Sequence, residues 1–319
     1  MILGQDKAVE QFASAWATRK LHHAWLLAGP TGVGKASFAK AAARRVLADA
    51  AGPPSDLPGI GTDDEHAIVK LVSAGSHPDM RWLERLPKEK GEGLARDITI
   101  KQIRSLGEFM GMTAALSPWR VAVIDSMDEL NKEASNALLK MLEEPPANTL
   151  FFLVSHAPGR LLPTIRSRCR RLQFEALADD AMTSILEARS PELSAAERQR
   201  IVSMSFGSAG RALAFAELGL TKLEELALAI LRQGDPTNAR RSDLATELGK
   251  KAAADRYAAF LGLAPSLIAR EARALEGSQR ERALDAYAKA RELAAVAPRL
   301  SLDPAATVFQ LGGILASVA

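Results

Sequence analysis

One nine-residue segment constrains the fold of this chain more than any other part of its sequence. The segment Gly29-Pro30-Thr31-Gly32-Val33-Gly34-Lys35-Ala36-Ser37 follows the apolar run Ala24–Ala28 and opens an alanine-rich helical pattern, Lys35–Ala48. Glycines at this spacing let backbone N–H groups surround phosphate oxygens, and a helix N-terminus adds positive potential. The order of strand, loop and helix therefore predicts a phosphate-binding loop (P-loop), in which Lys35 pairs with nucleotide phosphates. A simple glycine-rich turn would not need the lysine.

The rest of the first 175 residues alternates short apolar runs with helical patterns. The runs Met80–Leu83, Val121–Ile124 and Leu150–Val154 are predicted to be buried strands, because each is short, continuous and bounded by turn or charged residues. Asn131 is positioned to cap a helix that ends before Pro145. Strands that alternate with helices predict an α/β fold with a mostly parallel sheet covered on both faces.

Strand signals disappear after Glu175. Asp179–Leu218 is predicted to form a small helical domain, and the chain is predicted to be helical from about Thr221 to its end. One late helix is expected to begin at Ser278 and to end at Pro298, and another to begin at Asp303-Pro304.

Composition bounds the setting in which the protein works. The formal net charge of +3 and the isoelectric point near 9.0 are compatible with a nucleic-acid partner but do not by themselves indicate one. The one cysteine, Cys169, cannot form an internal disulfide or a multi-cysteine zinc site. Because the N-terminus has no apolar signal segment and no apolar run approaches the ~20 residues that span a bilayer, we expect a soluble cytoplasmic protein without membrane contact.

The P-loop lacks a group that metal-assisted hydrolysis needs. The residue after the loop lysine is normally Ser or Thr, whose hydroxyl binds Mg²⁺, but here it is Ala36. Ser37 lies ~100° further round the helix and is a poor substitute. Asp125 ends an apolar strand, where a carboxylate beside the P-loop can position Mg²⁺. Nucleotide binding through Lys35 stays open, whereas hydrolysis is not expected.

Several separate stretches resemble bacterial DNA polymerase III clamp-loader subunits, which are AAA+ proteins. Ser167-Arg168-Cys169 matches the Ser-Arg-Cys motif that carries the arginine finger of that family, and Ser155 falls at the position of its sensor-1 hydroxyl. The other matching stretches are Gly4-Gln5, Leu21-His22-His23-Ala24 and the long run from Asn136 to Pro146. The resemblance covers residues 1–220, and beyond them it rests on helical character.

This resemblance implies an AAA+ P-loop domain over residues 1–175, a small helical lid over 176–220 and an all-α collar for oligomerisation over 221–319. In the family, five such subunits form an open ring with ATP at the subunit interfaces, and the ring opens a sliding clamp on primed DNA. The implied partners are the gamma/tau ATPase, the delta subunit, the sliding clamp and primed DNA, within a DNA polymerase holoenzyme.

Within the family, the chain most resembles the type of subunit that has a degenerate nucleotide site yet keeps Ser-Arg-Cys. Motor subunits carry a glutamate after Asp125 that orients the attacking water, whereas this chain has Ser126. We therefore expect no independent ATPase activity, and we expect Arg168 to act in trans on the ATP of a neighbour, with Ser167 and Cys169 in the same motif. ATP or ADP binding is left open. The residues expected to line that vestigial site are Gly29, Thr31, Gly32, Gly34, Lys35, Asp125 and Ser155.

Two features depart from the family pattern. Many members hold zinc with four cysteines between the P-loop and the second strand, but this chain has no cysteine there, and we expect no zinc. The segment Ser76-His77-Pro78-Asp79 is instead predicted to form a turn before a strand. Arg211 lies one residue late for the sensor-2 arginine of motor subunits, which leaves its role open.

Two other functions compete with this interpretation. An active AAA+ motor, such as the main clamp-loader ATPase or a branch-migration helicase, would have to work without the hydroxyl and the glutamate that are missing here. A P-loop kinase for small molecules would leave the Glu-Glu-Pro-Pro and Ser-Arg-Cys stretches unexplained. For single residues, structural interpretations are favoured: packing or capping for His22, His23 and His156, first-turn helix positions for Asp128 and Glu129, and an unreactive thiol for Cys169.

Overall fold

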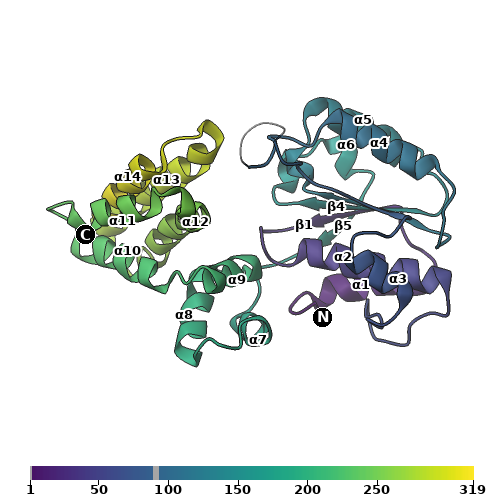
Figure 1. Ribbon diagram of the computed structural model, residues 1–319, viewed down its shortest axis with the longest axis horizontal. Helices are drawn as coiled ribbons and strands as arrows, with labels where there is room; N and C mark the ends of the chain where they lie inside the picture. The colour runs from purple at the N-terminus through teal and green to yellow at the C-terminus, as the bar shows by residue number, and fades with distance from the viewer. Residues whose placement is uncertain (1, 89–92) are drawn as a thin grey trace. The chain divides into compact units, whose positions relative to one another are not determined.

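The chain folds into two compact units, Met1–Ala181 and Met182–Ala319 (Figure 1). The computed structural model describes residues 2–88 and 93–319. The first unit contains the sheet and the P-loop, and the second unit is helical. We describe each unit by itself.

The first unit is built on one parallel sheet of five strands. The strands are β1 (Ala24–Ala28), β2 (Met80–Leu83), β3 (Arg120–Asp125), β4 (Thr149–Ser155) and β5 (Arg170–Gln173). They pair in the order β2-β3-β4-β1-β5, so β1, which leads into the P-loop, lies between β4 and β5. The four predicted strands are confirmed to within one residue at each end. The prediction lacked β5.

Helices cover both faces of this sheet, as the alternation of strands and helices predicted. The helices of this unit are α1 (Asp6–Ala17), α2 (Lys35–Ala51), α3 (Ala67–Ser73), α4 (Ile100–Gly111), α5 (Lys132–Glu143) and α6 (Pro163–Arg166), with 3₁₀ turns η1 (Met127–Glu129) and η2 (Pro158–Arg160). Along β4, Phe152 packs with α1 and α2, and Phe151 packs in the core on the other face with α4 and α5. Asn131 caps α5 as predicted, since its side chain accepts a hydrogen bond from the N–H of Ala134 at 2.8 Å.

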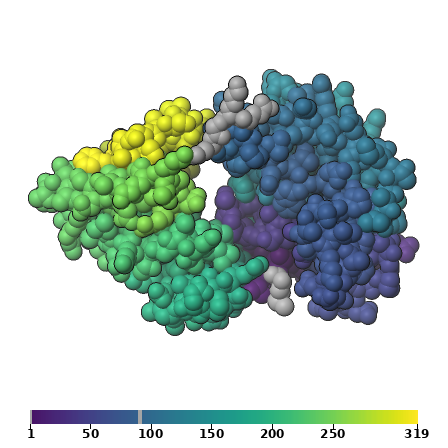
Figure 2. All heavy atoms as spheres, in the orientation of Figure 1, coloured from purple at the N-terminus to yellow at the C-terminus, as the bar shows by residue number. Residues whose placement is uncertain are grey.

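The second unit confirms the predicted all-helical character of the later part of the chain. Its helices are α7 (Asp179–Arg189), α8 (Ala195–Ser205), α9 (Ala209–Glu217), α10 (Thr221–Gln233), α11 (Ala239–Leu248), α12 (Ala254–Glu271), α13 (Gly277–Leu300) and α14 (Pro304–Ala316), with the 3₁₀ turn η3 (Lys251–Ala253). The yellow C-terminal helix α14 lies directly against the green helices that precede it (Figure 2). Within the described ranges, no helix combines the length and the apolar character that a membrane span requires.

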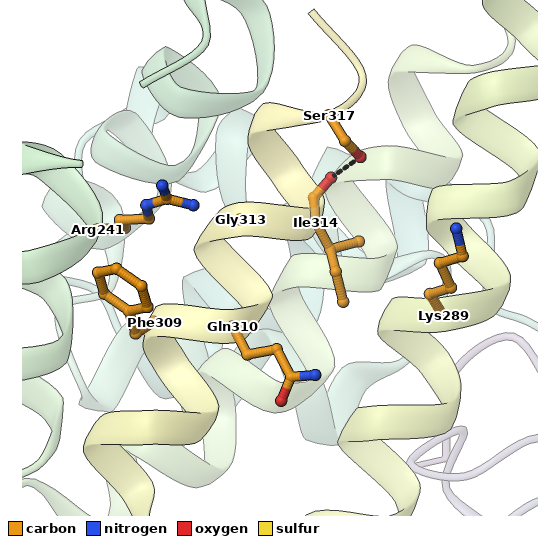
Figure 3. Close-up of a pocket in the computed structure, with 7 residues that line it drawn as sticks. All are labelled: Arg241, Lys289, Phe309, Gln310, Gly313, Ile314 and Ser317. Atoms are coloured by element: carbon orange, nitrogen blue, oxygen red, sulfur yellow. Dashed lines mark hydrogen bonds between the residues drawn. The ribbon is translucent and has the colours of Figure 1, made fainter. Parts of the chain in front are cut away.

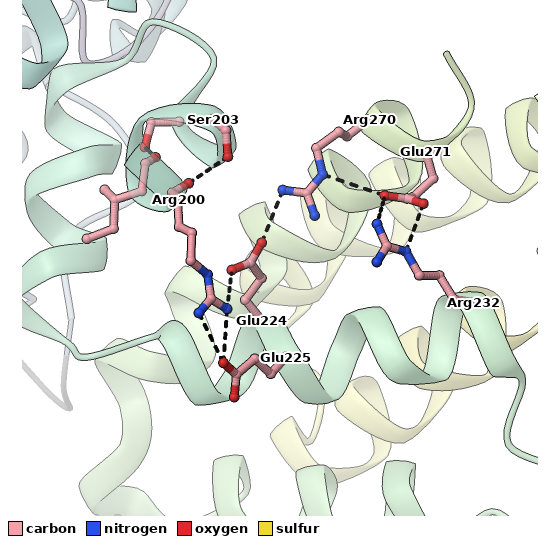
Figure 4. A network of polar contacts seen from close by, with 9 residues as sticks. Arg200, Ser203, Glu224, Glu225, Arg232, Arg270 and Glu271 are labelled. Atoms are coloured by element: carbon pink, nitrogen blue, oxygen red, sulfur yellow. Dashed lines mark hydrogen bonds and ion pairs between the residues drawn. The ribbon is translucent and has the colours of Figure 1, made fainter. Parts of the chain in front are cut away.

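A network of ion pairs joins the helices of the second unit (Figure 4). The carboxylate of Glu224 on α10 is 3% exposed and lies 3.4 Å from Arg200 on α8 and 3.1 Å from Arg270 on α12. Glu225 forms a second pair with Arg200 at 3.1 Å. Because α8 belongs to the predicted lid and α10 and α12 to the predicted collar, this network explains why residues 182–319 pack as one unit. The predicted boundary at residue 220 stays a prediction.

Two predicted helix ends need correction. Helix α13 begins at Gly277, so Ser278 lies inside the helix and is not its first residue. The first turn is closed by a hydrogen bond from the N–H of Arg280 to the carbonyl oxygen of Glu276. The same helix runs through Pro298 to Leu300, and Ser301, in a left-handed conformation with φ 52°, ends it. A residue in the left-handed conformation ends a helix by turning the chain. A proline inside a helix removes one hydrogen bond and crowds the carbonyl of the residue four positions earlier, and α13 continues past Pro298 for two more residues.

Candidate functional site

The P-loop lies where β1 ends and α2 begins, and its glycines have identifiable roles. Gly32 and Gly34 have φ angles of 77° and 102°, a region that favours glycine. Gly29 lies so close to the end of β5 that a Cβ atom there would lie 2.3 Å from the carbonyl oxygen of Phe174. The loop therefore needs glycine at these positions to turn and to approach the neighbouring strand.

Lys35 is the first residue of α2 and is almost completely buried, with 3% of its surface exposed. Its Nζ donates to the carbonyl oxygen of Gly29 at 2.7 Å and to that of Pro30. Burial lowers the pKa of Lys35 to about 8, although the carboxylates of Asp125 and Asp128 act in the opposite direction. The ammonium group is thus held inside the loop, where the sequence predicts nucleotide phosphates, and it is largely charged at neutral pH.

Asp125 ends β3 and provides the carboxylate that the sequence predicts near the P-loop. Burial and the neighbouring charge of Glu84 raise the pKa of Asp125, and the charge of Lys35 lowers it. Position 36 is alanine, and Ser126, 3% exposed, donates its hydroxyl to Asp128 at 3.5 Å. No group of three or more His, Cys, Asp or Glu side chains among the described residues could hold a metal ion. The site fits phosphate groups but does not supply the usual set of groups for Mg²⁺-assisted hydrolysis.

Asp128 has a role that the sequence interpretation missed. It lies in the first turn of η1, as expected, but its carboxylate also organises the end of β4. It accepts hydrogen bonds from the hydroxyl of Ser155 at 2.9 Å and from the N–H groups of His156 and Ala157 at 2.5 and 3.2 Å. The hydroxyl of the fully buried Ser155, predicted as sensor 1, is therefore bound to a carboxylate. Because these partners lie 27 to 29 residues further along the chain, only the fold brings them together.

Gln5 connects three parts of the first unit around the P-loop. Its side-chain N–H donates to the carbonyl oxygens of Val33 at 3.2 Å and of Glu175 at 2.9 Å. Its amide oxygen accepts from the N–H of Glu175 at 3.3 Å. This buried amide ties the N-terminal box to the P-loop and to the segment that follows β5.

Arg168 lies between α6 and β5, in the turn that carries the Ser-Arg-Cys motif. Its Nη2 lies 2.8 Å from Oε1 of Glu143, the last residue of α5, and its Nη1 donates to the carbonyl oxygen of Thr164 at 2.9 Å. The side chain is 34% exposed. The structure therefore brings the Glu-Glu-Pro-Pro and Ser-Arg-Cys stretches together and holds the guanidinium at the surface.

The residues on either side of Arg168 support the shape of this turn. The hydroxyl of Ser167 donates to the carbonyl oxygen of Thr164 at 3.1 Å. Cys169 packs against the core on the face of the sheet that α4 and α5 cover, and burial raises the pKa of its thiol to about 12. A protonated thiol is a poor nucleophile, and this burial therefore supports the interpretation of Cys169 as an unreactive residue.

The comparison with known proteins identifies the family. A family model described as DNA polymerase III, delta subunit, matches residues 4–178. The chain belongs to this family. The resemblance of the sequence to DNA polymerase III clamp-loader subunits is confirmed, and the relatives that are more than 30% identical to this chain are delta' subunits.

The relatives include delta', gamma and tau subunits of DNA polymerase III. The delta' subunit of Pseudomonas aeruginosa is 36% identical over 186 residues, which cover 58% of this chain and 53% of that protein. The delta' subunit of Escherichia coli is 32% identical over 206 residues, 64% of this chain and 58% of that protein. The tau subunit of Bacillus subtilis is 29% identical over 224 residues, 69% and 37% of the two chains. This chain spans about half the length of the curated relatives it matches.

Among solved structures, a protein related to the DNA polymerase III gamma subunit from Thermotoga maritima matches 97% of this chain and 98% of its own length. The sequence identity is 17% and the TM-score is 0.46. This likeness is distant.

The segment that follows α2 and precedes β2 is held by two paired side chains of that helix. The guanidinium of Arg45 lies 2.6 Å from the carboxylate of Asp49, and both side chains are largely buried. Arg45 also donates to the carbonyl oxygens of Ser55, Leu57 and Gly61, and Asp49 accepts from Trp16 and from the N–H of Ser55. These bonds fix the loop that the sequence predicts around residues 52–64. The absence of zinc stays a prediction.

The histidines and Arg211 make structural contacts. His23 bonds through Nε2 to the carbonyl oxygen of Leu142 at 3.0 Å, and its ring stacks on that of His22 at a centroid distance of 4.3 Å. These contacts agree with the expected packing or capping, since both rings pack together and His23 binds a carbonyl oxygen near the end of α5. Arg211 donates to the hydroxyl of Ser266 on α12 at 3.0 Å, and burial lowers its pKa. A sensor role for Arg211 stays open.

A hollow of about 430 Å³ lies on the surface of the helical unit (Figure 3). It is lined by Arg241, Lys289, Phe309, Gln310, Gly313, Ile314 and Ser317. The guanidinium of Arg241 lies over the ring of Phe309 at 4.7 Å. Since this hollow has no glycine loop at a helix N-terminus, we assign the candidate nucleotide site to the P-loop.

Replacing Asp128 with alanine is expected to lower the free energy of unfolding by about 1–2 kcal/mol. Three donors at the end of β4 would lose a charged acceptor, an effect that solvent reduces at this exposed carboxylate. Urea denaturation of the purified protein measures the change. Glu108→Ala, which removes an exposed carboxylate from α4, is the matched control, and equal stability of the two variants would contradict the role of Asp128.

Proposed function

We propose that this chain is a clamp-loader subunit that does not hydrolyse ATP itself but donates Arg168 to the ATP site of a neighbouring subunit. In this way it helps to load a sliding clamp onto primed DNA during replication. The observation that carries the proposal is the contrast within one unit: a formed P-loop lacks two hydrolytic groups, while a partly exposed arginine is anchored at the surface.

The P-loop of this chain supports nucleotide binding without turnover. ATP or ADP would be held by the backbone of the glycine loop and by Lys35, which keeps its charge at neutral pH. The residues assigned to this vestigial site are Gly29, Thr31, Gly32, Gly34, Lys35, Asp125 and Ser155. Because Ala36 offers no hydroxyl and Ser126 no carboxylate, a bound nucleotide would lack both a complete Mg²⁺ site and a group that orients water.

The chemistry of a guanidinium supports the trans role of Arg168. Phosphoryl transfer spreads negative charge over the γ-phosphate oxygens, and an arginine supplied by a neighbouring chain stabilises that charge. Fingers of this type are worth roughly 10³–10⁵ in rate. Arg168 lies on the surface of its unit, as a residue that acts on another subunit must.

The proposed partners follow from the family and from this division of labour. They are the gamma/tau ATPase, which would receive Arg168, the delta subunit, the sliding clamp and primed DNA, in the cytoplasm. Residues 176–220 would form the lid and 221–319 the collar through which the subunits assemble.

An active motor of the gamma/tau type is the competing function, since gamma and tau subunits are also among the relatives. Co-purification with sister AAA+ subunits supports either role, whereas hydrolysis separates the two.

The isolated protein is expected to release no phosphate from ATP above background, because Ala36 and Ser126 remove the metal hydroxyl and the water-orienting carboxylate. Steady-state phosphate release measures this, with Lys35→Met as the control for contaminating activity. Turnover at about 1–10³ s⁻¹, as in working enzymes, that disappears in the Lys35→Met variant would overturn the proposal in favour of an active motor.

A further inference from the structure

We propose that Glu143 is a positioning residue for Arg168. Its carboxylate, together with the carbonyl oxygen of Thr164, fixes the direction in which the guanidinium faces the ATP of the neighbouring subunit. This inference rests on the proposed function. It gives the first glutamate of the Glu-Glu-Pro-Pro stretch a role in that function.

The two contacts of Arg168 hold the plane of its guanidinium. Nη2 lies 2.8 Å from the Glu143 carboxylate and Nη1 donates to the Thr164 carbonyl at 2.9 Å. These acceptors bind two different terminal nitrogens, so the group cannot rotate about its last bonds without losing one of them. A guanidinium has five N–H groups, and these contacts use two of them. The remaining donors can bind a phosphate while the group stays anchored.

Glu143 provides a rigid anchor because the end of α5 is itself fixed. Leu142, the preceding residue, is 1% exposed, and its carbonyl oxygen is bound by His23 at 3.0 Å. Thr164, in contrast, belongs to the four-residue helix α6. The carboxylate therefore ties the turn of the Ser-Arg-Cys motif to the core of the first unit.

The position of Glu143 in α5 also argues for a role beyond helix stability. A negative charge in the last turn of a helix is unfavourable, because the C-terminal end of the helix dipole is itself negative. Glu143 is the last residue of α5, and its pairing with a guanidinium offsets this cost. With side chains that are 46% and 34% exposed, the pair contributes only about 0–1 kcal/mol to stability. A functional assay, and not unfolding, is therefore the informative test.

The test uses the clamp-loader complex reconstituted with the ATPase subunits of the same organism. The part of the DNA-stimulated ATP hydrolysis that Arg168→Ala removes defines the activity of the adjoining site. Glu143→Ala is expected to lower the kcat of this part about tenfold with little change in KM, since a misplaced catalytic group can cost up to about 10²-fold. Glu143→Gln, which keeps an acceptor oxygen, is expected to retain more activity than Glu143→Ala.

Glu144→Ala is the matched control, because it removes the adjacent exposed carboxylate and is expected to leave hydrolysis unchanged. In the Arg168→Ala background, Glu143→Ala is expected to cause no further loss, since it acts through the arginine. Thermal unfolding of each purified variant checks that it folds as the wild type does.

The outcomes separate the two proposals. Wild-type hydrolysis with Glu143→Ala, beside a defect with Arg168→Ala, would overturn the positioning role and leave the proposed function intact. Faster hydrolysis with Glu143→Ala would also overturn it, because the carboxylate would then restrain the arginine. Wild-type hydrolysis with Arg168→Ala would overturn the proposed function itself.

Discussion

A reconstituted clamp-loader complex that carries Arg168→Ala is expected to hydrolyse ATP about 10³–10⁵-fold more slowly at the one site that adjoins this subunit. The substitution removes the guanidinium that would stabilise charge on the γ-phosphate, but it leaves the nucleotide-binding groups of the neighbour in place. The complex should therefore assemble and bind ATP nearly as the wild type does. Clamp loading and DNA-stimulated hydrolysis measure the loss.

Arg166→Ala provides the control for this prediction. Arg166 lies two residues earlier, is exposed and carries the same charge, so its removal changes the local charge equally. We expect the Arg166→Ala complex to load clamps at the wild-type rate. A complex with Arg168→Ala that also loads clamps at that rate would show that Arg168 is not a finger.

Asp79→Ala is expected to lower the free energy of unfolding by about 3–5 kcal/mol. The Asp79 carboxylate is 2% exposed and accepts the N–H groups of Ala115, Leu116 and Ser117 at 2.6, 2.7 and 2.9 Å, in the turn that leads to β3. Removal of a charged acceptor leaves three backbone donors without their partner. Asp56→Ala, at an exposed position of the same unit, is the control, and an equally small effect of both substitutions in urea denaturation would contradict the prediction.

The same carboxylate makes stability depend on pH. Burial acts to raise the pKa of Asp79, but the three N–H groups and the neighbouring His77 outweigh it and hold the pKa below its ordinary value. The folded state then binds the proton less tightly than the unfolded state does. The contribution of the Asp79 carboxylate to the free energy of unfolding is therefore fully present above pH ~4. It is lost as the pH falls through the lower pKa of the folded state. Between pH 6 and pH 3, the urea concentration at the midpoint of unfolding should decrease less for Asp79→Ala than for the wild type.

The sequence was sufficient to predict four strands but not β5. Strands β1 to β4 are short apolar runs, whereas in β5 only Leu172 is buried and its neighbours are charged or polar. β5 pairs only with β1 at the edge of the sheet. Arg170 covers the ring of Trp25 at 5.0 Å, so a charged residue shields the core there. A strand at such an edge does not show the apolar run by which buried strands are found.

The candidate site was predictable where its residues are close in sequence. The glycines and Lys35 lie within one loop, and their spacing carries the chemistry. The contacts of Asp128 with Ser155 and of Glu143 with Arg168 join residues that lie 27 and 25 positions apart, through packing that a single sequence does not display. The motifs themselves were visible, and their contacts with each other were not.

DNA-stimulated ATP hydrolysis by the reconstituted complex, compared between Lys35→Met and Arg168→Ala, tests most directly whether this subunit acts in trans and not through its own P-loop. We predict that Lys35→Met leaves hydrolysis near the wild-type rate, because no turnover takes place at its own site. Arg168→Ala is predicted to remove the hydrolysis of the adjoining site. Loss of hydrolysis with Lys35→Met, together with wild-type hydrolysis with Arg168→Ala, would identify this chain as a working ATPase and contradict the trans role of Arg168.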